Sequence, residues 1–183
     1  MELLAIRQKI AHKLLEYDTL LFHGSCIALD GVGYLFTAKS GTGKSTHSRL
    51  WRECFPDRTF MVNDDMPLVR VPADGSAMAC GSPWNGKEHL DTNTSVPLCA
   101  IAALHRGTSD RIFPIQGNTE RLKSILNSVY YPREPQYRLR AISLADRLIT
   151  KTGLYHLECT ISREAVWTAY NGMRGDAAAD CPD

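Results

Sequence analysis

Residues 38 to 45 have the types and the spacing of a loop that binds the phosphates of a nucleotide. The segment Ala38-Lys39-Ser40-Gly41-Thr42-Gly43-Lys44-Ser45 directly follows the apolar run Tyr34-Leu35-Phe36-Thr37. Its glycines let the backbone curl so that N–H groups face an anion, and Ala38 stands where the strict pattern has glycine. Lys44 is predicted to reach the β- and γ-phosphates, and the Ser45 hydroxyl to bind Mg²⁺. The pattern therefore predicts a nucleoside triphosphate site, with contacts from Ser40, Gly41, Thr42, Gly43, Lys44, Ser45 and Thr46.

Two adjacent carboxylates, Asp64 and Asp65, follow a second apolar run, Thr59-Phe60-Met61-Val62. Mg²⁺ is a hard cation that needs oxygen ligands near the loop hydroxyl, and one aspartate meets that need. The second aspartate can then serve as a base toward an attacking hydroxyl. The alternative is a turn that carries two solvated acids.

His23 precedes the loop in the sequence Phe22-His23-Gly24-Ser25. A single histidine in such a strand is more often structural than functional. Because the next strands form a hairpin that leads into the loop, His23 can also face the γ-phosphate or a metal. His47, His105 and His156 are interpreted as structural or surface residues.

The segment Gly81 to His89 is dense in glycine and contains Trp84 and Lys87. Loops carry function when a rigid scaffold directs their side chains at a site. Lys87 is a candidate for neutralising charge on the transferred phosphoryl group, and Trp84 for lining a pocket. The alternative is a surface turn with a half-buried tryptophan. Arg52, His89 and Arg106 are further cations that the sequence alone does not place.

Apolar periodicity and turn residues predict the elements that must position these side chains. Helices are predicted over residues 2–16, 45–54, 119–129, 136–152 and 162–173. Strands are predicted over residues 20–23, 25–29, 33–37, 59–62, 67–71, 76–80, 96–104, 111–115 and 154–157. Asp30-Gly31 indicates a hairpin turn, Asn118 is the expected N-cap of one helix, and Gly153 the expected C-cap of another. Early strands and late helices favour an α/β fold with a mixed sheet over an alternating Rossmann arrangement.

Length and composition indicate one soluble, cytoplasmic domain. The chain has 183 residues, which suffices for a substantial core, and we expect one domain over residues 1–174 with a disordered tail at 175–183. Its 21 basic and 20 acidic residues argue against a nucleic-acid partner. The six cysteines form no C-x-x-C pair, which favours reduced thiols over zinc or redox motifs. The N-terminus lacks the order of a signal peptide, and no apolar run reaches membrane-spanning length.

Taken in order, these motifs resemble the kinase domain of HPr kinase/phosphorylase, within the phosphoenolpyruvate carboxykinase superfamily. The resemblance covers roughly residues 23–104 and rests on Phe22-His23-Gly24, on residues 30–36, on Ser40-Gly41-Thr42-Gly43-Lys44-Ser45, and on Val62-Asn63-Asp64-Asp65. The stretch Gly81 to Lys87 is similar to that of small bacterial HPr-kinase-like proteins. The resemblance implies the fold of the HPr kinase C-terminal domain, with ATP and Mg²⁺ as cofactors. It also implies that residues 1–174 form the kinase domain.

The same resemblance implies roles for individual residues. His23 becomes an active-site residue, and Lys44 and Ser45 take phosphate and Mg²⁺. Asp64 and Asp65 become the catalytic and metal-binding pair. We expect Asp65 to bind the metal together with Ser45, although the sequence leaves open which aspartate has which role. Thr46 replaces a usual acidic residue, and the Arg-Gly-rich second signature is missing. HPr itself as substrate and the phosphorylase back-reaction therefore do not follow from the resemblance.

Three functions remain open on the sequence. The first is an ATP-dependent kinase whose acceptor is a hydroxyl, expected to be a serine in a protein, a peptide or a small molecule. The second is a carboxykinase-like metabolic enzyme, for which the chain is short. The third is a nucleotide-binding regulatory module with little turnover. His23 and the two aspartates favour catalysis, while the acceptor, the base preference and the oligomeric state, a homo-oligomer included, stay open.

Overall fold

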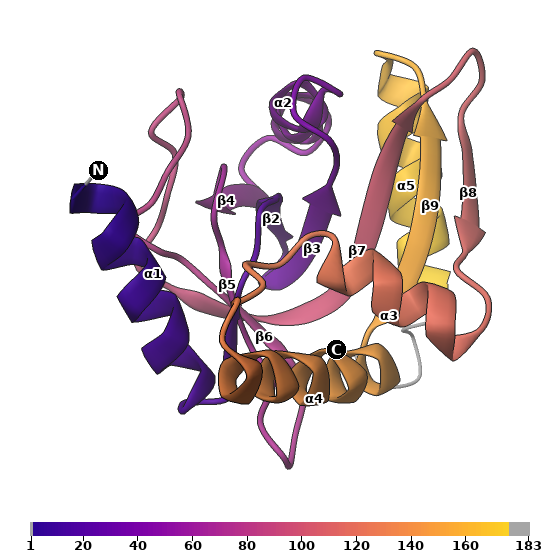
Figure 1. The fold of residues 1–183 in the computed structure, drawn as a ribbon. Coiled ribbons are helices and arrows are strands. Elements are labelled where there is room, and N and C mark those ends of the chain that lie inside the picture. Colours follow the sequence, from indigo (N-terminus) through magenta and orange to yellow (C-terminus); the bar gives the residue numbers. More distant parts are fainter. Residues whose placement is uncertain (1, 176–183) are drawn as a thin grey trace.

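A central mixed β-sheet lies between two layers of helices. The computed structural model describes residues 2–175, so the tail predicted for 176–183 lies outside the described residues. Figure 1 shows α3 (Asn118–Leu126) and α4 (Pro135–Lys151) on one side of the sheet and α5 (Arg163–Gly175) on the other. The mixed α/β fold predicted from the sequence is confirmed, and Gly175 ends α5 rather than beginning a tail.

The sheet has nine strands, in the order β1-β5-β6-β7-β3-β2-β4, and β9 and β8 continue from β7. The strands are β1 (Thr19–Leu21), β2 (Ser25–Leu29), β3 (Val32–Thr37), β4 (Thr59–Asn63), β5 (Leu68–Arg70), β6 (Met78–Cys80), β7 (Ser95–Arg106), β8 (Arg111–Pro114) and β9 (Gly153–Cys159). β7 joins the two parts of the sheet, because its first residues pair with β6 and its later residues run parallel to β3 and β9. The carboxyl ends of β3, β7 and β9 therefore meet at one edge of the sheet.

Two hydrophobic clusters cover the two faces of this sheet. One cluster joins the sheet to α1 (Glu2–Leu15), α3 and α4, and includes Phe22, Leu35 and Leu144. The other joins it to α2 (Lys44–Cys54) and α5, where the buried Trp51 and Phe36 rings lie 5.4 Å apart. This packing fixes the position of the start of α2 and therefore the position of the loop that precedes it.

The predicted hairpin at Asp30-Gly31 is confirmed. β2 and β3 pair antiparallel with Leu29 opposite Val32, and both turn residues have positive φ, 51° at Asp30 and 81° at Gly31. Such a turn matches the right-handed twist of the flanking strands. It brings His23, just before β2, back to the end of β3 where the loop begins.

Both predicted caps in the last third of the chain are wrong. Asn118 is the first residue of α3, and the residue before it, Gly117 with φ of 75°, is the N-cap. Gly153 is the first residue of β9, and the C-cap of α4 is Thr152, whose backbone is extended. Pairing with β7 draws Gly153 into the sheet, which overrides its local preference for a helix end.

None of the helices within residues 2–175 is long and apolar enough to cross a membrane. None of the five cysteines in that part of the chain forms a disulfide bond.

Candidate active site

The loop between β3 and α2 has the backbone form that its glycines predict. Gly41 and Gly43 have φ values of 78° and 124°, and nothing lies within 4 Å of where a Cβ would stand on either residue. Glycine is therefore favoured at these two positions because the backbone has positive φ there, and not because other protein atoms leave no room for a side chain. α2 starts at Lys44, so its first N–H groups and the positive end of its dipole lie beside the loop.

Buried polar contacts hold α2 against the sheet. The Nε2 of His47 lies 3.0 Å from the indole Nε1 of Trp51, which donates to it, and the hydroxyls of Ser48 and Ser25 lie 2.7 Å apart. Burial lowers the pKa of His47 to about 4, so this imidazole is neutral at pH 7. The interpretation of His47 as structural is confirmed.

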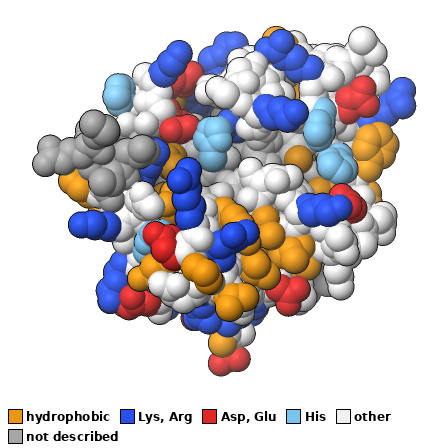
Figure 2. All heavy atoms as spheres, in the orientation of Figure 1, with side chains coloured by type: hydrophobic (Ala, Val, Ile, Leu, Met, Phe, Trp, Pro, Cys, Tyr) orange, Lys and Arg blue, Asp and Glu red, His pale blue; other side chains and the backbone are white. Residues whose placement is uncertain are grey.

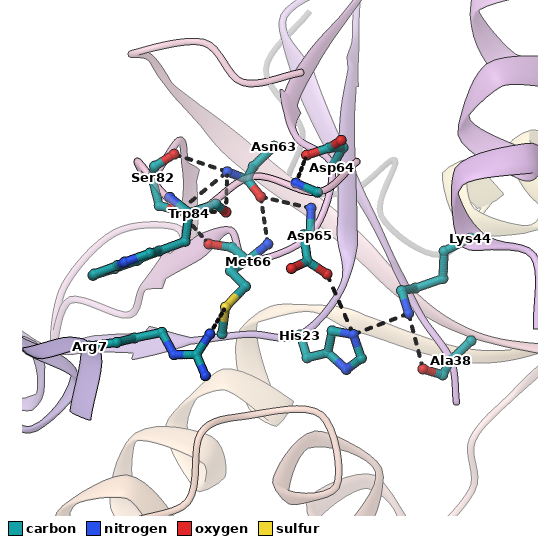
Figure 3. A network of polar contacts seen from close by, with 11 residues as sticks. Arg7, His23, Ala38, Lys44, Asn63, Asp64, Asp65, Met66, Ser82 and Trp84 are labelled. Atoms are coloured by element: carbon teal, nitrogen blue, oxygen red, sulfur yellow. Dashed lines mark hydrogen bonds and ion pairs between the residues drawn. The ribbon is translucent and has the colours of Figure 1, made fainter. Parts of the chain in front are cut away.

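Three polar side chains lie close together beside the loop between β3 and α2: those of Lys44, His23 and Asp65 (Figure 3). The ammonium of Lys44 lies 3.5 Å from His23 Nε2 and donates a 3.2 Å hydrogen bond to the carbonyl of Ala38. The same Nε2 lies 3.6 Å from a carboxylate oxygen of Asp65. Residues from three separate parts of the sequence thus place a cation, an imidazole and a carboxylate side by side.

The electrostatics of this cluster favour a neutral His23. Burial lowers the pKa of His23, the charge of Lys44 lowers it further, and the Asp65 carboxylate opposes both. Burial also lowers the pKa of Lys44, again opposed by Asp65. A neutral imidazole beside a carboxylate and a partly buried ammonium can accept a proton or a hydrogen bond from a ligand.

Asn63 fixes the turn that carries the two aspartates. Its buried side-chain oxygen accepts hydrogen bonds from the backbone N–H groups of Asp65 and Met66, at 2.9 and 2.6 Å. Its amide nitrogen donates to the carbonyls of Ser82 and Trp84 at 3.1 and 3.2 Å. One side chain therefore links the end of β4 to the segment Gly81 to His89.

Asp64 and Asp65 have different surroundings. Asp64 is buried, and one of its oxygens accepts the Gly86 N–H at 2.5 Å. Asp65 is partly exposed and faces His23 and Lys44. The segment Gly81 to His89 thus reaches the acid pair through Gly86, while Lys87 is exposed and Trp84 is half-buried.

Arg106 and Arg7 join this region from distant parts of the sequence. Arg106, at the end of β7, donates to the loop carbonyls of Gly41 and Thr42 at 2.6 and 3.1 Å. Arg7, on α1, donates to the sulfur of Met66 at 3.2 Å and lowers the pKa of His23 by its charge. The sequence pattern indicated Arg106 as a further cation but did not predict its position. No pattern in the sequence pointed to Arg7. The remaining unplaced cations lie elsewhere: Arg52 pairs with Glu88 at 3.1 Å, and His89 lies 3.1 Å from Asn85.

The oxygen atoms near the loop suit Mg²⁺ rather than a softer metal. Within residues 2–175, no group of three or more His, Cys, Asp or Glu side chains could hold a metal ion by itself. Mg²⁺ in nucleotide sites typically takes one or two protein oxygens and completes its shell with phosphate and water. The Ser45 hydroxyl and the Asp65 carboxylate are donors of this kind.

The comparisons with known proteins found a matching family model and a distant structural similarity. No curated protein matches this chain. Among solved structures, the Hpr(Ser) kinase/phosphatase from Coxiella burnetii is similar, with 13% sequence identity and a TM-score of 0.45 over 88% of this chain and 99% of that one. That similarity is too distant to transfer an activity or a residue's role. The family model described as SynChlorMet cassette protein ScmC matches residues 1–165, and the chain therefore belongs to the ScmC family.

Proposed function

We propose that this protein is an ATP- and Mg²⁺-dependent phosphotransferase whose acceptor is a hydroxyl group, with serine as the expected acceptor type. The proposal rests on one observation: beside the glycine loop, the imidazole of His23 lies close to both the Lys44 ammonium and the Asp65 carboxylate. A loop that only bound nucleotide would need the glycines, Lys44 and Ser45. The additional carboxylate can hold Mg²⁺ and the additional imidazole can contact the transferred group, and a site that only binds nucleotide does not need the imidazole.

The loop and α2 would hold the phosphates. Backbone N–H groups around Gly41 and Gly43 and at the start of α2 would bind the phosphate oxygens, while Arg106 donates hydrogen bonds to the carbonyls of Gly41 and Thr42. Ser45 and Asp65 would hold Mg²⁺, which neutralises charge on the β- and γ-phosphates. Lys44 would leave the Ala38 carbonyl and stabilise the charge on the transferring group.

In the transfer step, the acceptor oxygen forms a bond to the γ-phosphorus as the bond between that phosphorus and the β,γ-bridging oxygen breaks. ADP leaves with the electron pair of the broken bond. The hydroxyl proton passes to a carboxylate, which we assign to Asp64, and His23 lies beside the transferred group. Lys87 is a further candidate for charge stabilisation if the segment Gly81 to His89 closes over the site.

Turnover of γ-labelled ATP tests this function. We expect the purified protein with Mg²⁺ to release ADP and to transfer label to serine-containing acceptors, and EDTA to stop both. Tight Mg·ATP binding with no ADP release under any of these conditions would instead support the regulatory module. None of the five cysteines within residues 2–175 forms a disulfide bond, which fits a reducing cytoplasm, where ATP is available.

A further inference from the structure

Two cavities flank the loop, one on each side. The smaller, of about 450 Å³, lies on the α2 side and is lined by Thr46, His47, Leu50 and Ile161 among others. The larger, of about 680 Å³, lies between the loop and α3 and includes His23, Ala38 and Lys39. Both volumes fall in the range of small-molecule sites.

The direction in which the Lys44 side chain points indicates which cavity would hold which part of the substrates. Its ammonium points to His23, which lines the larger cavity, so the γ-phosphate end of a nucleotide would face that side. The nucleoside must then extend the other way, toward the smaller cavity with its apolar Leu50 and Ile161. The larger cavity is left for the acceptor.

The larger cavity is rich in cations. Its charged side chains are Lys39, Arg106 and Lys123 against one acid, Glu120. Lys123 and Glu120 form an exposed ion pair at 2.7 Å, so that pair adds little net charge, while Lys39 and Arg106 add two positive charges. Figure 2 shows histidine and basic side chains on both sides of a hollow in the upper half of one face.

A pair of histidines lines this cavity, and one of them, His105, also lines the smaller cavity. His105 and His156 lie on the neighbouring parallel strands β7 and β9, with Nε2 of one 3.2 Å from Nδ1 of the other. Ser124, Asn127 and Ser128 add further polar groups from α3 and the residues after it. Imidazole, hydroxyl, amide and ammonium groups together can all donate hydrogen bonds to an anion.

We infer that the larger cavity binds the phosphate acceptor and that this acceptor carries a carboxylate close to its hydroxyl. The inference rests on the proposed function and names the substrate class of the same site. The hydroxyl would lie at the His23 end, next to the γ-phosphate, and the carboxylate would lie toward Lys123 and the two histidines. Transfer would proceed as described above, with the acceptor oxygen as nucleophile and ADP as leaving group.

The test uses protein saturated with Mg·ADP, which occupies the phosphate loop, and observes the imidazole signals of His105 and His156 by NMR. D-Glycerate and glycerol form one matched pair of probes, since they differ by the carboxylate. The capped dipeptides N-acetyl-Asp-Ser-amide and N-acetyl-Asn-Ser-amide form a second pair. We expect the acidic member of at least one pair to shift both histidines and its neutral partner to have no effect. The responding pair tells whether the carboxylate comes from a small hydroxy acid or from a peptide.

Lys123→Glu should weaken binding of the acidic probe at least tenfold, and by more than it weakens binding of Mg·ADP. Lys9→Glu, at an exposed position of α1, is the control and should change neither. The inference is overturned if neither acidic probe shifts the histidines, if the neutral probes bind equally well, or if Lys123→Glu has no effect. Calorimetric titration with Mg·ADP alone tests the proposed function separately from the inference about the acceptor. Absence of nucleotide binding would contradict the proposed function itself.

Discussion

At the scale of single residues, His23 is a neutral imidazole held between two opposite charges. Its ring lies between Lys44 and Asp65, 3.5 Å from one and 3.6 Å from the other, and nearly half of its side chain is exposed. Exposure lets a ligand reach the ring, while partial burial and the two basic neighbours keep it neutral. The surroundings of His23 can therefore be tested before any substrate is known.

The pKa of His23 should lie below its ordinary value of about 6.5. Lys44→Ala should raise this pKa, because removing a nearby cation makes protonation easier. Asp65→Asn should lower it further, because the carboxylate stabilises the imidazolium. NMR titration of the histidine signals measures all three values. Identical His23 titrations in the wild type and both variants would show that this cluster does not form in solution.

The two aspartates should differ in their effects on turnover. Asp65→Asn should weaken Mg·ATP binding, with partial rescue at higher Mg²⁺, because a metal ligand is lost. Asp64→Asn should leave nucleotide affinity close to normal and slow transfer, with the acidic limb of the pH–rate profile lost. Steady-state kinetics over Mg²⁺ concentration and pH distinguishes the two. The same phenotype in both variants would contradict this division of roles.

At the scale of elements, Asn63 and His47 hold the parts of the site in place. Asn63 connects β4 to the segment Gly81 to His89, and His47 lies under α2 against Trp51. Both are buried polar groups whose hydrogen bonds are satisfied inside the protein, which makes their loss costly.

Asn63→Ala should destabilise the protein by about 2–4 kcal/mol, because several buried hydrogen-bonding groups lose their partner at once. Urea unfolding gives this difference in the free energy of unfolding. Asn93→Ala, at an exposed position four residues after the segment Gly81 to His89, is the control and should stay within about 0.5 kcal/mol of the wild type. A cost for Asn63→Ala as small as that of the control would mean that the turn is held by other contacts.

His47 should make the protein less stable in mild acid. Its pKa of about 4 lies below the value of about 6.5 in the unfolded chain, so between these values only the unfolded chain binds this proton. The free energy of unfolding therefore falls as the pH falls through this interval, by about 3 kcal/mol in all. His47→Gln can still accept from Trp51 and should flatten this dependence, whereas the exposed His89→Gln should not. An unchanged slope in His47→Gln would contradict the burial of His47.

The local features of the site could be predicted from the sequence, and the long-range ones could not. The glycine loop, the Asp30-Gly31 turn and the acid pair each depend on a few consecutive residues. The contact from Arg106 to the loop depends on the parallel pairing of β7 with β3, which joins residues about 65 positions apart. The predicted cap at Gly153 was wrong for the same reason, because pairing with β7 overrode the local preference.

At the scale of the whole molecule, β7 organises both the fold and the site. It runs parallel to β3 and β9, so the loop, Arg106 and the histidine pair all lie at the carboxyl edge of these strands. Sites at that edge are the rule in open α/β sheets. The two cavities beside the loop follow from this arrangement, since α2 and α3 lie on opposite faces of the sheet.

The most direct test of the central claim is the rate of ADP formation from Mg·ATP in the wild type and in Lys44→Ala. The account predicts a loss of about a hundredfold or more in this variant, because one preorganised charge is removed from the transition state. Its melting temperature and circular dichroism should stay unchanged, and Lys9→Ala should retain full activity. A folded Lys44→Ala protein that forms ADP at the wild-type rate would contradict the assignment of this loop as the phosphate site.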